Sequence, residues 1–144
     1  MGEITTGRLA DILTHSEICD VAEYRTKYLT TILTMSFSEY YLSVLGKKEA
    51  SRNAAVANSG IEVHYAYQIL SGDRNPKRDK MLCLCIGGGF SVLETNRALE
   101  RAKAGCLYPK RLRDAIIMLA LNKNINVVWR VNELLSENDQ ELLS

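Results

Sequence analysis

Short stretches with helical apolar spacing, divided by frequent turn residues, limit the fold of this chain more than any other feature. Between the turn-forming Gly, Pro and Asn residues, apolar residues recur every three or four positions, as on the buried side of an amphipathic helix. The best candidate for a strand, Val127-Val128-Trp129, is short and leads into helix-forming residues. The sequence therefore predicts an all-α protein built from several short helices.

Helices are expected over residues 6–13, 17–34, 37–45, 52–58 and 63–71. After them, Asn75 and Pro76 have the order of an N-cap followed by a proline in the first turn, which predicts a helix that runs to about residue 86. Ser91 and Glu94 fit a capping box, so another helix should follow Ser91. The last two helices are expected to begin at Pro109 and after an Asn126 cap.

The length of 144 residues suits one domain with one hydrophobic core, and 47% hydrophobic and 24% charged residues are ordinary for a folded soluble protein. No apolar run approaches the roughly 20 residues that a membrane-spanning helix needs. The first residues, Met1-Gly2-Glu3-Ile4, have neither the basic start nor the apolar stretch of a signal peptide. We therefore expect a single cytoplasmic domain over residues 1–144 with no membrane contact.

The four cysteines and two histidines lack the spacing of a disulfide framework or a zinc site. No Ser-His-Asp, Cys-His or paired-glutamate arrangement favours catalysis. The glycine triplet at residues 87–89 lacks the Lys-Ser/Thr that completes a nucleotide-binding loop. We expect reduced and mostly buried thiols, no metal or other cofactor, and no enzymatic activity.

Positive charge is concentrated in the middle of a chain whose net charge is only +1. Residues 46–80 hold seven Lys or Arg against four Asp or Glu, whereas residues 1–45 hold three against six. A second basic cluster, made of Lys110, Arg111 and Arg113, is more typical of a solvated face. DNA-binding domains are usually clearly basic, so the low net charge speaks against this class, but the positive surplus lies in the middle segment.

Residues 51–72 have the spacing of two short helices that cross over a tight turn. Such a unit needs a side chain of modest size where the helices meet, a glycine with a positive φ in the turn, and an apolar residue packed beneath the turn. The residues at these positions are Val56, Gly60 and Ile61. Ala66 and Ile69 would then face inward from the second helix, and Gly72 would end it.

This stretch, with the Gln68-Ile69-Leu70-Ser71-Gly72 run and Pro76, resembles the lambda-repressor/Cro-type (XRE) helix-turn-helix family. The flanking Tyr40-Tyr41-Leu42 and Tyr108-Pro109-Lys110-Arg111 are similar to those of small bacterial single-domain members that carry extra helices. The resemblance implies a five-helix core centred on residues 37–86, with flanking helices in residues 1–36 and 91–144.

The resemblance also implies a transcriptional regulator, most simply a repressor, that reads double-stranded DNA. The second helix of the unit would enter the major groove while the first lies across the backbone. The base-reading candidates are Val63, His64, Tyr67, Gln68 and Ser71. Gln68 is the foremost of them, because a side-chain amide can bond both N6 and N7 of adenine. The candidates for backbone contacts are Ser51, Arg52, Asn53, Arg74, Lys77, Arg78 and Lys80.

Relatives of this type act as homodimers on paired half-sites, so the resemblance implies a homodimer here. Trp129 and Leu134-Leu135 in the C-terminal helices are candidates for its interface, although Trp129 fits core packing equally well. Tyr65, within the second helix of the unit, is expected to belong to the core.

The alternative function is a helix-turn-helix protein-interaction module, such as an adaptor, an antitoxin-like protein or a kinase-linked signalling protein, with weak or no DNA binding. The near-neutral charge favours this alternative, as does Glu62, which stands where the family often has Ser or Thr. A carboxylate is repelled by phosphates. Glu62 could instead accept from cytosine N4 or favour the positive end of the helix dipole.

Overall fold

The structure, a computed structural model, describes residues 35–144, and all regular secondary structure in that range is helical. Seven helices follow one another there: α4 (Phe37–Lys47), α5 (Arg52–Ser59), α6 (Val63–Leu70), α7 (Arg78–Gly87), α8 (Val92–Arg101), α9 (Leu112–Asn122) and α10 (Val128–Glu137). The prediction of an all-α protein is confirmed for this part of the chain. The helices expected over residues 6–13 and 17–34 lie outside the described residues, as do Cys19 and His15.

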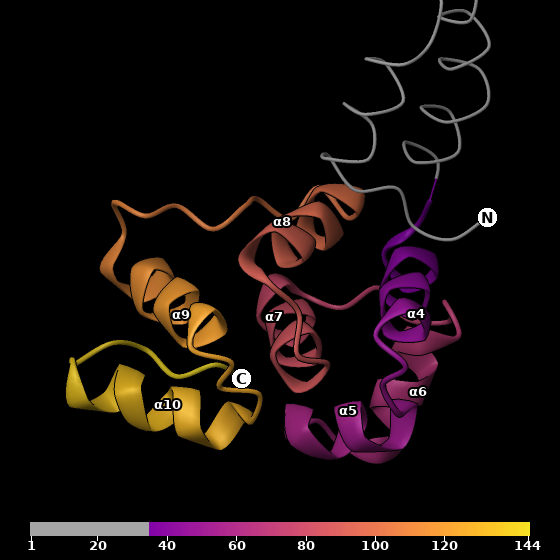
Figure 1. Ribbon diagram of the computed structural model, residues 1–144, viewed down its shortest axis with the longest axis horizontal. Helices are drawn as coiled ribbons and strands as arrows, with labels where there is room; N and C mark the ends of the chain where they lie inside the picture. Colours follow the sequence, from indigo (N-terminus) through magenta and orange to yellow (C-terminus); the bar gives the residue numbers. More distant parts are fainter. Residues whose placement is uncertain (1–34) are drawn as a thin grey trace, which may run out of the picture.

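α7 is the central helix of the described structure. Figure 1 shows it between α4, α5 and α6 on one side and α9 and α10 on the other. Every residue from Met81 to Gly87 is buried, so this helix carries apolar or small residues on all its faces. Cys83 and Cys85 are therefore both buried, and burial raises the pKa of Cys83 to about 11. Of the three cysteines in the described residues, two are buried, as expected of mostly buried thiols, and Cys106 is exposed.

Gly87 lets α7 approach the backbone of α5 directly. A Cβ atom at this position would overlap the carbonyl oxygen of Ala55 and lie 2.9 Å from the backbone nitrogen of Ser59. No side chain fits in that space, and the two helices consequently make the most extensive helix–helix contact in residues 35–144. This contact fixes α5, and α6 after it, on the core.

Serine side chains begin three of the helices. Ser36 before α4 and Ser51 before α5 each accept a hydrogen bond of 3.2 Å from the backbone amide three residues further on. Ser91 and Glu94 form the predicted capping box at α8, with hydrogen bonds of 3.1 and 2.9 Å. The capping box predicted from the sequence at Ser91 is thereby confirmed.

The predicted starts of α7, α9 and α10 are wrong by one to three residues, and none of these three helices has a side-chain cap. The predicted and observed first residues are Pro76 and Arg78 for α7, Pro109 and Leu112 for α9, and Val127 and Val128 for α10. Asn126 therefore lies outside the cap position that it was expected to fill.

Two ion pairs join the first turn of α7 to the first turn of α9. The Arg78 guanidinium contacts both carboxylate oxygens of Asp114, at 3.2 and 2.9 Å. The Arg113 guanidinium contacts both oxygens of Asp79, at 3.1 and 2.9 Å. We call this arrangement the crossed Arg–Asp pairs. It contradicts the expectation of a solvated face for Arg113, whereas Lys110 is exposed as expected.

The crossed Arg–Asp pairs also hold segments without regular structure. Arg78 donates to the carbonyl oxygens of Gly105 and Cys106, at 3.1 and 3.2 Å. Arg113 donates to those of Glu141 and Leu142, at 2.8 and 3.0 Å. The loop before α9 and the tail after α10 are thereby tied to the central helix.

Candidate nucleic-acid interface

The turn between α5 and α6 has the predicted register. Gly60 has a φ of +71°, in the left-handed region, and Ile61 is buried directly after it. The hydroxyl of Ser59 donates to the Val56 carbonyl at 2.6 Å and accepts from the Ile61 amide at 3.2 Å. The turn is thus held from within, and it fixes the direction in which α6 leaves α5.

One face of α6 is buried and the opposite face is open. Ala66 and Ile69 are buried, as predicted, and Tyr65 is half-buried against the core. Of the five base-reading candidates, four have exposed side chains and Tyr67 alone is half-buried. The exposed candidates are Val63, His64, Gln68 and Ser71. The helix therefore presents a mixed polar and apolar surface outward.

Glu62 is the N-cap of α6. Its two carboxylate oxygens accept hydrogen bonds from the backbone amides of Tyr65, at 2.8 Å, and His64, at 3.1 Å. The bond from Tyr65, followed by that from His64, lowers the pKa of Glu62 below its usual value. From the sequence, two roles were open to this carboxylate, contact with cytosine N4 or interaction with the helix dipole. In the structure, Glu62 lies at the positive end of the α6 dipole.

A hydrogen bond joins the recognition-helix candidate to the first turn of α5: the hydroxyl of Tyr67 donates to Oδ1 of Asn53. The same tyrosine lines a groove of about 370 Å³ between α4, α5 and α6, together with Arg52 and Ser71. The hydrogen bond and the groove thereby bring together two backbone-contact candidates, Arg52 and Asn53, and two base-reading candidates, Tyr67 and Ser71.

Arg74 lies beside Gln68. Its Nε donates to the Gln68 side-chain oxygen, Oε1, at 3.2 Å. The hydroxyl of Ser71 lies 3.0 Å from both the Gln68 carbonyl oxygen and a carboxylate oxygen of Asp73. The side chains of Gln68 and Ser71 are therefore already hydrogen-bonded within the protein.

The remaining basic candidates divide into two groups. Arg52 and Lys77 are exposed and Lys80 is half-buried, so all three have access to solvent. Arg78 differs from them, because its guanidinium already donates hydrogen bonds to Asp114 and to two loop carbonyl oxygens. Sequence reasoning missed Asp114. The signal was present as two Arg-Asp dipeptides, at residues 78–79 and 113–114, but only the fold shows that they face each other.

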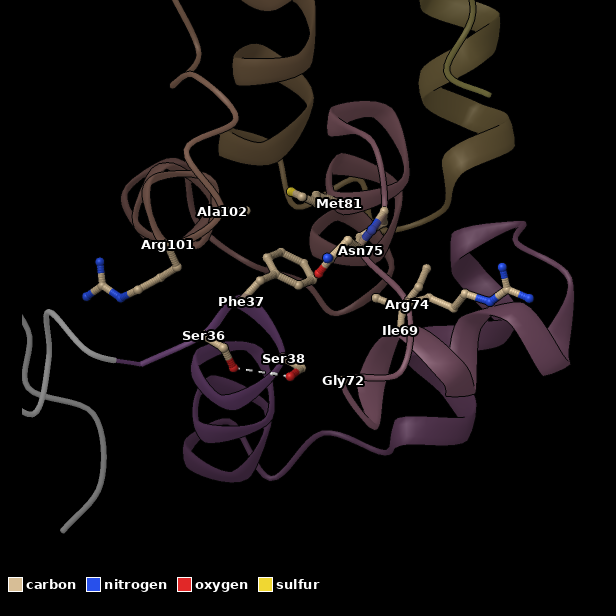
Figure 2. Close-up of a pocket in the computed structure, with 11 residues that line it drawn as sticks. Ser36, Phe37, Ser38, Ile69, Gly72, Arg74, Asn75, Met81, Arg101 and Ala102 are labelled. Atoms are coloured by element: carbon tan, nitrogen blue, oxygen red, sulfur yellow. Dashed lines mark hydrogen bonds between the residues drawn. The ribbon is translucent and has the colours of Figure 1, made fainter.

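A smaller pocket of about 220 Å³ lies between the start of α4, the α6–α7 loop and the end of α8 (Figure 2). Ser36, Ser38 and Asn75 supply polar groups, while Arg74 points out of it toward α6 and Arg101 points away on the other side. The Arg101 guanidinium lies over the Tyr40 ring, 5.0 Å from its centroid. Residues 35–144 contain no group of three or more His, Cys, Asp or Glu side chains that could hold a metal ion.

Within the same residues, none of the helices has the length and apolar character that crossing a membrane requires. Comparisons of the chain with models of known protein families, with curated proteins and with solved structures find no match.

Proposed function

We propose that this protein binds specific sequences of double-stranded DNA and represses transcription. One observation carries the proposal: α6 buries Ala66 and Ile69 on one side and leaves His64 and Gln68 exposed on the other, with Val63 exposed in its first turn. A helix placed in this way can enter the major groove without disturbing the core. Helices α4–α8 would then be the five-helix core of the lambda-repressor/Cro-type family, which extends the core predicted from residues 37–86 to include α8.

The surroundings of α6 suit a phosphate backbone. Arg52 in the first turn of α5 and Lys77 before α7 are exposed cations on the flanks of the unit. Backbone amides of α6 already bond the Glu62 carboxylate, which limits its repulsion of a nearby phosphate. The proposed backbone contacts are therefore Ser51, Arg52, Asn53, Lys77 and Lys80, without Arg78, which is paired with Asp114. Arg74 is not among them, because its Nε donates to Gln68.

The proposed homodimer would use α10. Trp129 in its first turn is 65% exposed, the largest exposure among the large apolar residues of the described structure. Leu135 is fully buried and Leu134 half-buried, so neither of these core residues supplies an open surface. The helix begins close to the turn, since a Cβ atom at Gly60 would be 4.0 Å from the Cβ of Val128. A homodimer formed through this face would carry two recognition helices, as binding to paired half-sites requires.

Selection of bound duplexes from a random pool, followed by salt titration of the preferred site, tests the DNA-binding function. Phosphate contacts should make the logarithm of the affinity fall linearly with that of the salt concentration. Gln68→Ala should weaken the preferred site by about 1–3 kcal/mol and leave binding to a scrambled duplex unchanged. The matched control is Gln140→Ala in the C-terminal tail, which should change neither.

A salt slope near zero in the intact protein would contradict DNA binding. That result would favour the second candidate, a protein-interaction module. The net charge of +1 and the exposed Trp129 favour this alternative, because large exposed aromatic residues are common at protein interfaces.

A further inference from the structure

We propose that Arg74 is a base-reading residue that selects guanine, and that Gln68 orients it. This inference rests on the proposed DNA-binding function and names the base that the site recognises. The sequence places Arg74 after the recognition helix, where a contact to the backbone is expected. The structure instead brings its guanidinium to the outward face of α6, with Nε 3.2 Å from Oε1 of Gln68.

The hydrogen bond to Gln68 uses the Nε–H of Arg74 and leaves the N–H groups of its two terminal nitrogens for a ligand. A guanidinium has five N–H groups, and one of them is used by Gln68. The two terminal nitrogens of Arg74 contact no other group in residues 35–144, and its side chain is exposed. Figure 2 shows it extended away from the pocket between α4 and α8. If Gln68 lies in the groove, the fork of Arg74 lies there too.

The N–H groups of Arg74 that are not bonded to Gln68 can bind only hydrogen-bond acceptors on a base. Guanine offers two acceptors in the major groove, O6 and N7, and arginine bonds both in the commonest specific contact. Adenine presents the N6 amine, itself a donor, beside N7, so a guanidinium, which has donors only, cannot pair with adenine through both positions. The pair therefore favours guanine over the adenine that Gln68 alone would read.

Arg74→Lys separates base reading from backbone contact. Lysine keeps the positive charge but loses both the planar fork and the Nε–H that bonds Gln68. We expect the preference for guanine at one position of the selected site to fall by about 5- to 150-fold, with the salt slope unchanged. Arg52→Lys is the matched control: the same exchange at a backbone-contacting residue should leave the preference at every position unchanged.

A double-mutant cycle tests the role of Gln68. If Gln68 acts by orienting Arg74, then Gln68→Ala and Arg74→Lys together should cost little more in guanine preference than either alone. Both residues are exposed, so circular dichroism and thermal melting should show all variants folded with nearly unchanged Tm.

Two results would overturn the inference. A guanine preference that survives Arg74→Lys, in a protein that still binds its selected site, would return Arg74 to the backbone contacts and leave the proposed function standing. Absence of any salt-dependent duplex binding in the wild type would overturn both.

Discussion

At the scale of single residues, two glycines inside helices have opposite surroundings. Gly87 in α7 faces the backbone of α5, and a methyl group there would overlap the Ala55 carbonyl oxygen. Gly46 in α4 is exposed, and a methyl group there would meet nothing within 4 Å. Alanine is intrinsically favoured over glycine in a helix by about 0.5–1 kcal/mol, so packing alone decides the sign of each substitution.

Gly87→Ala should destabilise the protein by roughly 1–3 kcal/mol, because α5 and α7 must move apart to admit the methyl group. Gly46→Ala is the control and should be neutral or stabilising by up to about 1 kcal/mol. Urea denaturation of both variants measures the difference. Equal effects of the two substitutions would show that α7 and α5 are not in direct backbone contact.

At the scale of helices, the sequence predicted the starts that depend on local side chains and missed those that depend on the fold. Ser91 caps its helix as expected and Ser51 caps α5 in the same way, since a hydroxyl bonds an amide three residues away whatever the rest of the chain does. Pro76 and Pro109 precede α7 and α9 without opening them. The first turns of those helices contain the crossed Arg–Asp pairs, which join residues far apart in sequence and have no local pattern.

The cap of α6 predicts a pH dependence. The pKa of Glu62 is lowered in the folded protein, so its carboxylate stabilises α6 at pH values above its unfolded pKa. This contribution is lost as the pH falls through the folded pKa. Glu62→Gln should therefore lower Tm near neutral pH and have a smaller effect in acid, while Glu137→Gln at the exposed end of α10 should show no such trend. A difference in Tm that stays constant with pH would contradict the role of the charge.

At the scale of the whole molecule, the crossed Arg–Asp pairs join the segment that contains α7 to everything after α8. Asp114 is almost fully buried, with 5% of its side chain exposed, and it also accepts from the Tyr108 amide at 2.9 Å. Asp79 is more open, with 23% of its side chain exposed. The two pairs have the same chemistry but different access to water, and their contributions to stability should differ accordingly.

Asp114→Ala should cost about 3–5 kcal/mol of unfolding free energy, because it leaves the Arg78 guanidinium without its buried partner. Asp79→Ala should cost less, on the order of 1–3 kcal/mol. Urea denaturation at low and high salt measures both losses, and the Asp114 loss should change little with salt because the pair is screened from solvent. Losses below about 0.5 kcal/mol for both variants would mean that the pairs act as ordinary surface ion pairs.

The burial of α7 on every side has a consequence for protein engineering. α5 covers one side of this helix and the helices that follow cover others, so a fragment that ends at the glycine triplet would expose residues such as Leu82 and Ile86 to water. The α5–α6 unit therefore cannot be excised and grafted onto another scaffold with its own core intact. For the proposed DNA-binding function, new specificity is better introduced in place on α6, where the exposed Val63, His64 and Gln68 can be exchanged without touching the packing beneath them.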